Sequence, residues 1–362
     1  MKQLATVVAG LAVLVLTLAT GALAGTPGAP GAVYALTNSA QGNAVAVYER
    51  SADGQISSPR LYPTAGLGSG AGGLGSQGAV ALTPDGHVLL AVNAGSNTVS
   101  AFAVTTDGLQ LLDVVPSFGV QPVSITVRRH VAFVVNAASL SIHGYSLDNR
   151  GLTPIAGSSQ ALSPNANTPS QIAFAPNGVL VVTERGSNTI DSFTLDANQV
   201  PSAPKQIASV GNAPFGFDFA SGNAIVSDAN AGPGNSAATS YAVAADGTLA
   251  ANGAPVQTGQ GAACWLVTSK DGRYAFTANA GSGTISTFSV AANGVLSLAH
   301  TTTVSAGAHI IDEAVSANGR FLYVIADKTG RVYGFRIGSD GSLAALGAVD
   351  GLPAGNGGLA AS

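Results

Sequence analysis

Four side chains of this 362-residue sequence are of types that activate water and stabilise a negatively charged oxygen: Glu184, Arg185, His309 and Asp312. A carboxylate or an imidazole can act as a general base, and a guanidinium can stabilise the oxyanion that forms when water attacks a carbonyl carbon. Charged residues make up only 9% of the chain. The pairs Glu184–Arg185 and His309–Asp312 stand out in a sequence with so few charges. They predict a site for acid–base hydrolysis.

Each of these residues also has a structural interpretation. Glu184 stands where equivalent segments carry Asn, so its carboxylate would then only accept backbone hydrogen bonds in a turn, as Asp228 and Asp327 would. Arg185 either binds an anion or is a solvated charge. Asp312, with its neighbouring histidine, either lines a pore or stabilises the fold. The sequence leaves both interpretations open.

Three further side chains are candidates for substrate contacts, because they lie on or beside positions that open the innermost strand of a repeat: Gln171, Phe215 and Trp265. Trp265 is the only tryptophan and is either a stacking platform or a core residue. Cys264 is the only cysteine and is either a small buried hydrophobe or a nucleophile. A single cysteine also excludes an internal disulfide.

Other catalytic classes lack their sequence signatures. The chain has no G-x-S-x-G, no P-loop, no H-E-x-x-H and no paired C-x-x-C motif. Its five histidines do not have the spacing of metal ligands. We therefore expect no cofactor, no metal and no serine-nucleophile triad.

Seven copies of one short phrase position these residues. The clearest copies are AVNAGSNTVSAF (91–102), VTERGSNTIDSF (182–193) and TANAGSGTISTF (277–288), and equivalent polar residues recur at steps of 43 to 55 residues. Repeats of this length, made of strands and Gly-rich turns, are typical of propeller blades. The predicted fold class is all-β, a seven-bladed β-propeller of four-stranded antiparallel blades.

The two ends of the chain predict how the ring closes. The first strand, VYALT (33–37), has no innermost strand before it, and GGLAAS (357–362) matches the start of one. We expect these N- and C-terminal strands to pair, which would complete the first blade and leave no free sheet edge.

Residues 1–24 have the pattern of a secretory signal peptide. Lys2 precedes an apolar stretch from Leu4 to Leu18, and Ala22-Leu23-Ala24 has the small-x-small spacing of a cleavage site. The apolar stretch is too short to span a membrane comfortably. We therefore expect one propeller domain over residues 25–362, monomeric, secreted or periplasmic, and without a membrane span after cleavage.

Charge argues against two classes of partner. The formal net charge is −4, and no basic patch is present. Nucleic acids and anionic membranes are therefore not expected as partners. A small molecule, a protein or a glycan is expected instead.

The strand phrases resemble the lactonase family of seven-bladed β-propellers, which includes propeller-type 6-phosphogluconolactonase and carboxymuconate cyclase. The resemblance covers residues 33–362 and is carried by ALTPDGHVLLAVNAGSNTVSAF (81–102), SQIAFAPNGVLVVTERGSNTIDSF (170–193), APFGFDF (213–219) and CWLVTSKDGRYAFTANAGSGTISTF (264–288). It implies His, Arg and Glu groups around the central channel. Because few Arg or Lys residues converge there, phosphogluconolactone is not the expected substrate.

The resemblance implies cofactor-free hydrolysis of a small lactone, or the reverse cyclisation, at the mouth of the channel. The protein would then be a hydrolase of carbohydrate metabolism. Glu184, Asp312 or His309 would activate water, and Arg185 would stabilise the oxyanion. Glu313 is a further candidate for a family-type group at the channel.

Two alternatives belong to other classes. The chain is either a non-catalytic exported propeller that binds a ligand or a protein at its rim, or a calcium-dependent lactonase with Glu184, Asn136 and Asp228 as ligands.

Overall fold

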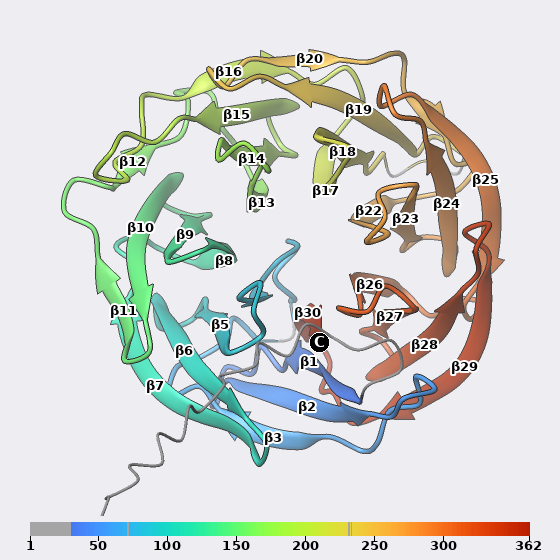
Figure 1. The fold of residues 1–362 in the computed structure, drawn as a ribbon, viewed down its shortest axis with the longest axis horizontal. Helices are drawn as coiled ribbons and strands as arrows, with labels where there is room; N and C mark the ends of the chain where they lie inside the picture. Colours follow the sequence, from blue (N-terminus) through green and yellow to red (C-terminus); the bar gives the residue numbers. More distant parts are fainter. Residues whose placement is uncertain (1–29, 71, 231, 233) are drawn as a thin grey trace, which may run out of the picture.

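The computed structural model of the protein describes residues 30–362 apart from 71, 231 and 233. The predicted signal peptide lies outside the described residues. The described part consists of strands and turns arranged as seven antiparallel sheets around a central axis (Figure 1). Within it, no helix is long and apolar enough to cross a membrane. The prediction of an all-β, seven-bladed propeller is confirmed.

The blades have the following strands, given from the axis outward. Blade 1 contains β30 (Gly357–Ala361), β1 (Gly31–Leu36), β2 (Ala44–Arg50) and β3 (Arg60–Pro63). Blade 2 contains β4 (Val80–Leu82), β5 (Val88–Asn93), β6 (Thr98–Thr105) and β7 (Gly108–Pro116). Blade 3 contains β8 (Pro122–Arg128), β9 (Val131–Asn136), β10 (Ser141–Asp148) and an outer strand broken into β11 (Gly151–Pro154) and β12 (Gln160–Ala161).

Blade 4 contains β13 (Pro169–Phe174), β14 (Leu180–Glu184), β15 (Thr189–Phe193) and β16 (Lys205–Ala208). Blade 5 contains β17 (Pro214–Ala220), β18 (Asn223–Asp228), β19 (Ala237–Val243) and a broken outer strand, β20 (Leu249–Ala251) and β21 (Val256–Gln257). Blade 6 contains β22 (Ala263–Thr268), β23 (Tyr274–Asn279), β24 (Thr284–Val290) and β25 (Leu296–Thr303). Blade 7 contains β26 (Ile310–Val315), β27 (Phe321–Ala326), β28 (Arg331–Ile337) and β29 (Leu343–Asp350).

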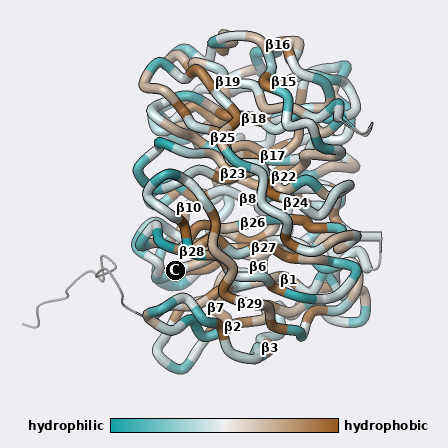
Figure 2. The backbone as a smooth tube through the Cα atoms, turned by 90° about the vertical axis from the view of Figure 1, so that its right-hand side faces the viewer, coloured by the Kyte–Doolittle hydropathy of each residue, from teal (hydrophilic) through white to brown (hydrophobic). Residues whose placement is uncertain are grey.

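The turns define two faces of the disc. The hairpin face carries the turns between first and second and between third and fourth strands, such as Asp85-Gly86 and Asp246-Gly247. The loop face carries the turns between second and third strands, such as Ser187-Asn188, and the connections between blades. Brown, hydrophobic stretches lie along the strands in Figure 2 and teal, hydrophilic ones mostly at turns. Function is therefore confined to these faces and the channel that joins them.

The ring closes as expected from the chain ends. β30 pairs antiparallel with β1, with Tyr34 opposite Ala360. The backbone N–H of Ala32 also donates to Oγ of Ser362 at 2.8 Å. The first blade is thus assembled from both ends of the described chain.

One aromatic residue per blade seals the contact between neighbours. It is the residue that ends each sequence repeat, it lies on the third strand, and it is at most 2% exposed in every blade: Tyr48, Phe102, Tyr145, Phe193, Tyr241, Phe288 and Phe335. Truncation of a buried ring of this size typically costs about 3–5 kcal/mol. The repeat is therefore first a packing device, and the residues that vary around it are the candidates for function.

Candidate functional site

The channel is closed at its loop-face end by the connection between β3 and β4. Gln77 lies across the axis: its Nε2 donates to the carbonyl oxygen of Leu266 at 2.7 Å, and the N–H of Leu266 donates to its Oε1 at 2.9 Å. The N–H of Gln77 also donates to the carbonyl of Ser170 at 3.0 Å. Neighbouring Ser76 donates to the carbonyl of Val123 at 2.8 Å. One connection thus ties together the innermost strands of blades 3, 4 and 6.

Two predicted substrate contacts pack at this closed end. The indole N–H of Trp265 donates to the carbonyl oxygen of Ser76 at 2.9 Å, and its ring lies 5.0 Å from that of Phe215 in an edge-on contact. The Arg185 guanidinium lies over the Phe215 ring, 5.1 Å from its centre. Both aromatic rings are buried. The structure therefore places Arg185 on the aromatic layer that closes the channel.

Cys264 lies in the same region. Burial raises the pKa of its thiol to about 12, although the positive charge of Arg185 opposes the shift. A thiol with such a pKa stays protonated at neutral pH and is a poor nucleophile. Cys264 is half-buried and packs against the hydrophobic core, so it acts as a small apolar side chain, although not as a fully buried one.

Glu184 lies in the loop-face turn of blade 4 and is fully buried. Its Oε2 accepts hydrogen bonds from the hydroxyls of Thr189, at 2.7 Å, and Ser187, at 3.1 Å. Burial, together with the nearby carboxyl of Asp191, raises the pKa of Glu184 to about 8. Asp228 is held similarly by Thr239 Oγ1 at 2.6 Å, and burial raises the pKa of Asp228 to about 7. Both carboxyls belong to the last residue of a second strand, at its loop-face end.

His309 and Asp312 are separated by the structure. The imidazole Nδ1 of His309 lies 2.9 Å from Oδ1 of Asp327, in a partly exposed pair on the loop face of blade 7. Asp312 lies further along β26, at a β-bulge where its φ is +28°, an unusual value for a non-glycine residue. The four predicted catalytic residues therefore do not share one pocket.

The other half of the channel, toward the hairpin face, is hollow. Its cavity has a volume of about 320 Å³ and is lined by the innermost strands of all seven blades. The charged and amide side chains among its lining are Gln77, Gln171, Asp218, Lys270, Asp312 and Glu313. Three of the residues predicted as candidates, Gln171, Asp312 and Glu313, thus belong to one cavity.

The two adjacent acids of β26 are buried and differ in their partners. Burial raises the pKa of Asp312 to about 7, while the backbone N–H groups of Glu313, Gly358, Leu359 and Gly78 favour its ionised form. The N–H of Glu313 donates to Oδ1 of Asp312 at 2.9 Å. The pKa of Glu313 is raised well above its usual range, first by burial and also by the charge of Asp312. Asp312 therefore titrates near neutral pH, and burial favours the neutral form of Glu313.

Two charged residues of this cavity, Asp218 and Lys270, were not predicted from the sequence. Asp218, half-buried on β17, accepts hydrogen bonds from the N–H of Phe219 at 2.8 Å and from the N–H and hydroxyl of Thr268 at 2.9 and 2.8 Å. Lys270 is exposed in the hairpin-face turn of blade 6. The sequence does contain a signal for Asp218, because this charged residue interrupts the otherwise apolar phrase APFGFDF (213–219).

Gln171 acts as a bridge between blades. Its Nε2 donates to the carbonyl oxygen of Phe217 at 2.9 Å, and its Oε1 accepts from the N–H of Phe217 at 2.7 Å. Gln77 forms the same two-bond pattern with Leu266. Both amides thus hold the cavity wall in shape.

The proposed calcium ligands lie in three different blades. Asn136 donates from Nδ2 to the carbonyl of Ser117 at 3.0 Å, while Glu184 and Asp228 are held in their own turns. Among the described residues, no group of three or more His, Cys, Asp or Glu side chains is arranged to hold a metal ion.

Known proteins share this architecture. A provisionally assigned 6-phosphogluconolactonase from Bacteroides fragilis is 18% identical, with a TM-score of 0.72 over 91% of this chain and 97% of that one. The periplasmic gluconolactonase of Pseudomonas aeruginosa is 18% identical, with a TM-score of 0.71 over 91% and 98%. Virginiamycin B lyase from Staphylococcus aureus is 12% identical, with a TM-score of 0.56 over 77% and 86%. These likenesses show the fold.

No curated protein matches the sequence. The family described as "Lactonase, 7-bladed beta-propeller" matches residues 34–235 and 226–357, which together span most of the chain. The resemblance seen in the strand phrases is therefore confirmed, and the chain belongs to the lactonase family of seven-bladed β-propellers.

Proposed function

We propose that this protein hydrolyses a small, unphosphorylated lactone in the hairpin-face half of its channel, with Asp312 as the general base. The observation that carries the proposal is that Asp312, with its pKa near 7, lines a cavity of about 320 Å³ built from all seven blades. A base that titrates near the working pH is suited to activate water. Membership of the lactonase family supports the choice of a cyclic ester as substrate.

In the proposed reaction, Asp312 removes a proton from water as the water oxygen bonds to the lactone carbonyl carbon. The neutral Glu313 acid or the Lys270 ammonium stabilises the charge on the carbonyl oxygen. The tetrahedral intermediate then collapses, the ring C–O bond breaks, and the proton returns from Asp312 to the leaving oxygen. The product is an open-chain hydroxy acid, and Asp312 is again ionised.

The cavity carries one lysine and no arginine among its lining residues. A phosphorylated sugar lactone would require several converging cations. The proposed substrate is therefore neutral, with ring hydroxyls or apolar carbons that fit between the amides and the Val and Leu side chains of the wall.

Export of a monomer to the periplasm or the cell exterior is part of the proposal. The signal-peptide pattern of residues 1–24 supports it. A periplasmic gluconolactonase among the proteins of the same fold is consistent with it.

The test is acid release, followed by pH-stat, from glucono-δ-lactone, δ-valerolactone and dihydrocoumarin. Asp312→Asn should lower kcat/KM on the best substrate by about 100-fold or more, because it removes the base. Wild-type kcat/KM should rise with an apparent pKa near 7, as Asp312 ionises. Asp107→Asn, on the exposed hairpin face of blade 2, is the control and should retain full activity. Full activity in a folded Asp312→Asn variant, or no turnover of any lactone, would contradict the proposal.

A binding function at the loop face is the second candidate. Four large apolar side chains are about half exposed in the connections between blades there: Leu67, Phe118, Val120 and Val210. Exposed apolar side chains gathered on one face favour a macromolecular partner. Absence of lactone turnover, together with loss of ligand capture in Phe118→Ser, would favour this function.

A further inference from the structure

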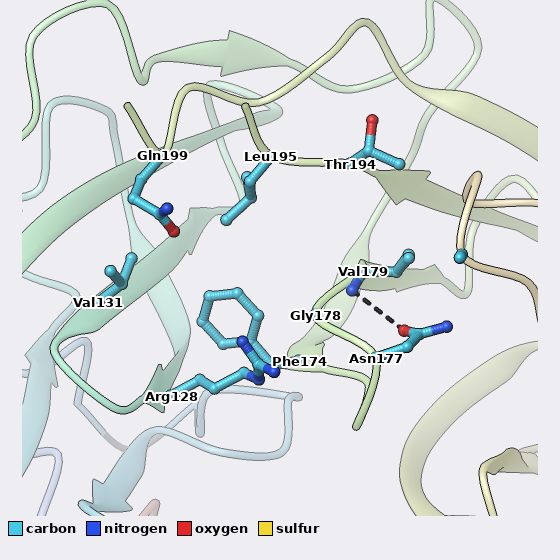
Figure 3. Close-up of a pocket in the computed structure, with 10 residues that line it drawn as sticks. Arg128, Val131, Phe174, Asn177, Gly178, Val179, Thr194, Leu195 and Gln199 are labelled. Carbon is cyan, nitrogen blue, oxygen red and sulfur yellow. Dashed lines mark hydrogen bonds between the residues drawn. The ribbon is translucent and has the colours of Figure 1, made fainter. Parts of the chain in front are cut away.

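A second cavity, of about 220 Å³, opens on the hairpin face at the seam between blades 3 and 4 (Figure 3). In the close-up, Gln199 and Leu195 point into it from one side, and Arg128 enters from the other. Val131 and Phe174 complete its apolar wall. This seam cavity is separate from the channel, since none of its residues lines the channel cavity.

Gln199 is exceptional among its structural equivalents. In five blades the turn between third and fourth strands is closed by the N–H of one residue, which donates to the carbonyl three residues earlier. That residue has a positive φ in all five blades. In blade 4 it is Gln199, and in the other four it is a glycine: Gly54, Gly247, Gly294 and Gly341. Glycine adopts this backbone conformation without strain, whereas glutamine does not. The sequence thus retains a side chain where the fold favours none.

The neighbouring blade also differs at the matching position from two of the four glycine seams. Where the turn has Gly54 or Gly341, the space that a Cβ would enter is filled by Phe321 or Tyr274, the first residue of the second strand in the preceding blade. At the seam between blades 3 and 4 that residue is Val131. A small valine and an inward-pointing amide therefore replace a ring packed against glycine, and a cavity results.

The charge at this cavity is positive. Among the described residues, the Arg128 guanidinium makes a single hydrogen bond, a long one of 3.3 Å to the carbonyl of Pro176. No Asp or Glu is present among the residues that line the cavity. Arg128 thus retains most of its donors for a ligand, in a fork that matches a carboxylate.

We propose that the seam cavity binds a small organic monocarboxylate with a flat apolar body. Arg128 pairs with the carboxylate, the Gln199 amide donates a further hydrogen bond, and Phe174, Val131 and Leu195 contact the body. Small-molecule sites use a few convergent polar groups of this kind to fix a ligand against apolar side chains, which here are those of Phe174, Val131 and Leu195. The volume of about 220 Å³ suits a single-ring acid better than a larger metabolite.

Titration calorimetry with benzoate at pH 7, and with benzamide as its uncharged analogue, tests the proposal. Arg128→Gln should weaken benzoate binding by at least about tenfold, because a charge-assisted hydrogen bond is lost. Benzamide should bind the wild type at least about tenfold more weakly than benzoate does. The adjacent Arg129→Gln variant, which removes the same charge, should bind as the wild type does.

Two further variants separate this site from the channel. The double variant Val131→Phe with Gln199→Gly copies the Phe321–Gly54 seam and should abolish binding while the melting temperature is kept or raised. Asp312→Asn should bind benzoate normally, so failure of the lactonase proposal would leave this one standing. Saturable binding that survives Arg128→Gln, equal binding of benzamide, or no benzoate binding to the wild type would overturn it.

Discussion

The two ends of the central channel are built from the same innermost strands, but one end is filled by side chains and the other is a cavity. At the loop-face end, Gln77 lies across the axis, and Trp265 and Phe215 pack beside it. At the hairpin-face end, the same strands line a cavity whose wall includes Asp218 and Asp312. The difference arises from one connection, between β3 and β4, which fills one end only.

Because of this difference, charged residues at the closed end stabilise the fold, whereas charged residues at the open end are available for chemistry. Arg185 is near the axis but lies over the Phe215 ring at the closed end. Glu184 is bound by two hydroxyls of its own turn. Asp312 lies beside an open cavity, where a substrate has room. Proximity to the axis is therefore insufficient, and the end of the channel at which a residue lies decides its role.

The largest effect is expected at the closed end, from Trp265→Ala. This change removes a ring that is 6% exposed, and it leaves the carbonyl of Ser76 without its indole donor. We expect a loss of about 3–5 kcal/mol in the free energy of unfolding. Urea denaturation measures it, with Trp265→Phe as the control that keeps a ring and should lose less. An unchanged urea midpoint in Trp265→Ala would show that the closing layer does not stabilise the ring.

The second prediction concerns pH. The folded-state pKa of Glu184, about 8, lies above its ordinary value of 4.5, so the unfolded chain releases this proton first as pH rises. The stability of the folded state should therefore fall between about pH 5 and pH 8, by about 2–4 kcal/mol from this group.

A double variant isolates that contribution. Blade 6 has Asn279 and Ser286 at the positions of Glu184 and Asp191, joined by a hydrogen bond of 2.9 Å. Glu184→Asn with Asp191→Ser copies this pair, so it should raise the melting temperature at pH 8 and reduce its dependence on pH. Glu49→Gln, at an exposed site, should do neither. An equally steep pH dependence in the double variant would contradict the assignment.

The third prediction opens the closed end. Gln77→Ala leaves the buried N–H and carbonyl of Leu266 without their side-chain partners. The expected cost is about 1–3 kcal/mol in the free energy of unfolding, with faster amide exchange at Leu266. Gln55→Ala is the matched control, because Gln55 is exposed and its side chain makes one hydrogen bond, to the carbonyl of Leu346. Unchanged exchange at Leu266 would show that Gln77 does not close the channel.

The architecture was predictable because it depends on local regularities. Seven copies of one phrase, each ending in an aromatic residue, specify seven third strands with buried rings. The pairing of β30 with β1 followed from a missing strand at one end of the chain and an extra strand at the other. Such features depend on residues close in sequence, or on a simple count of strands.

The candidate site was only partly predictable, because it depends on contacts between distant blades. Asp312 and Gln171 were identified from their strand positions, and both line the cavity. The closure of one channel end by Gln77 depends on a contact with Leu266, 189 residues away, which no local pattern specifies. The repeat pattern alone does not distinguish the two ends of the channel, so it favours the charged residues at the loop-face turns. Asp218 and Lys270, near the other end, therefore remained unnoticed.

The smallest effect on stability, but a specific effect on substrate, is expected at the open end from Lys270→Met. Lys270 is exposed at the cavity and packs little, so the free energy of unfolding should change by less than about 0.5 kcal/mol. If its ammonium binds the lactone carbonyl, KM on the best substrate should rise by about threefold to tenfold. Lys205→Met, which removes an exposed lysine paired with Asp246 on the same face, is the control. Equal KM values in the two variants would show that Lys270 does not bind the substrate. The substrate would then be bound by the amides and carboxyls deeper in the channel, and the open end would only be its entrance.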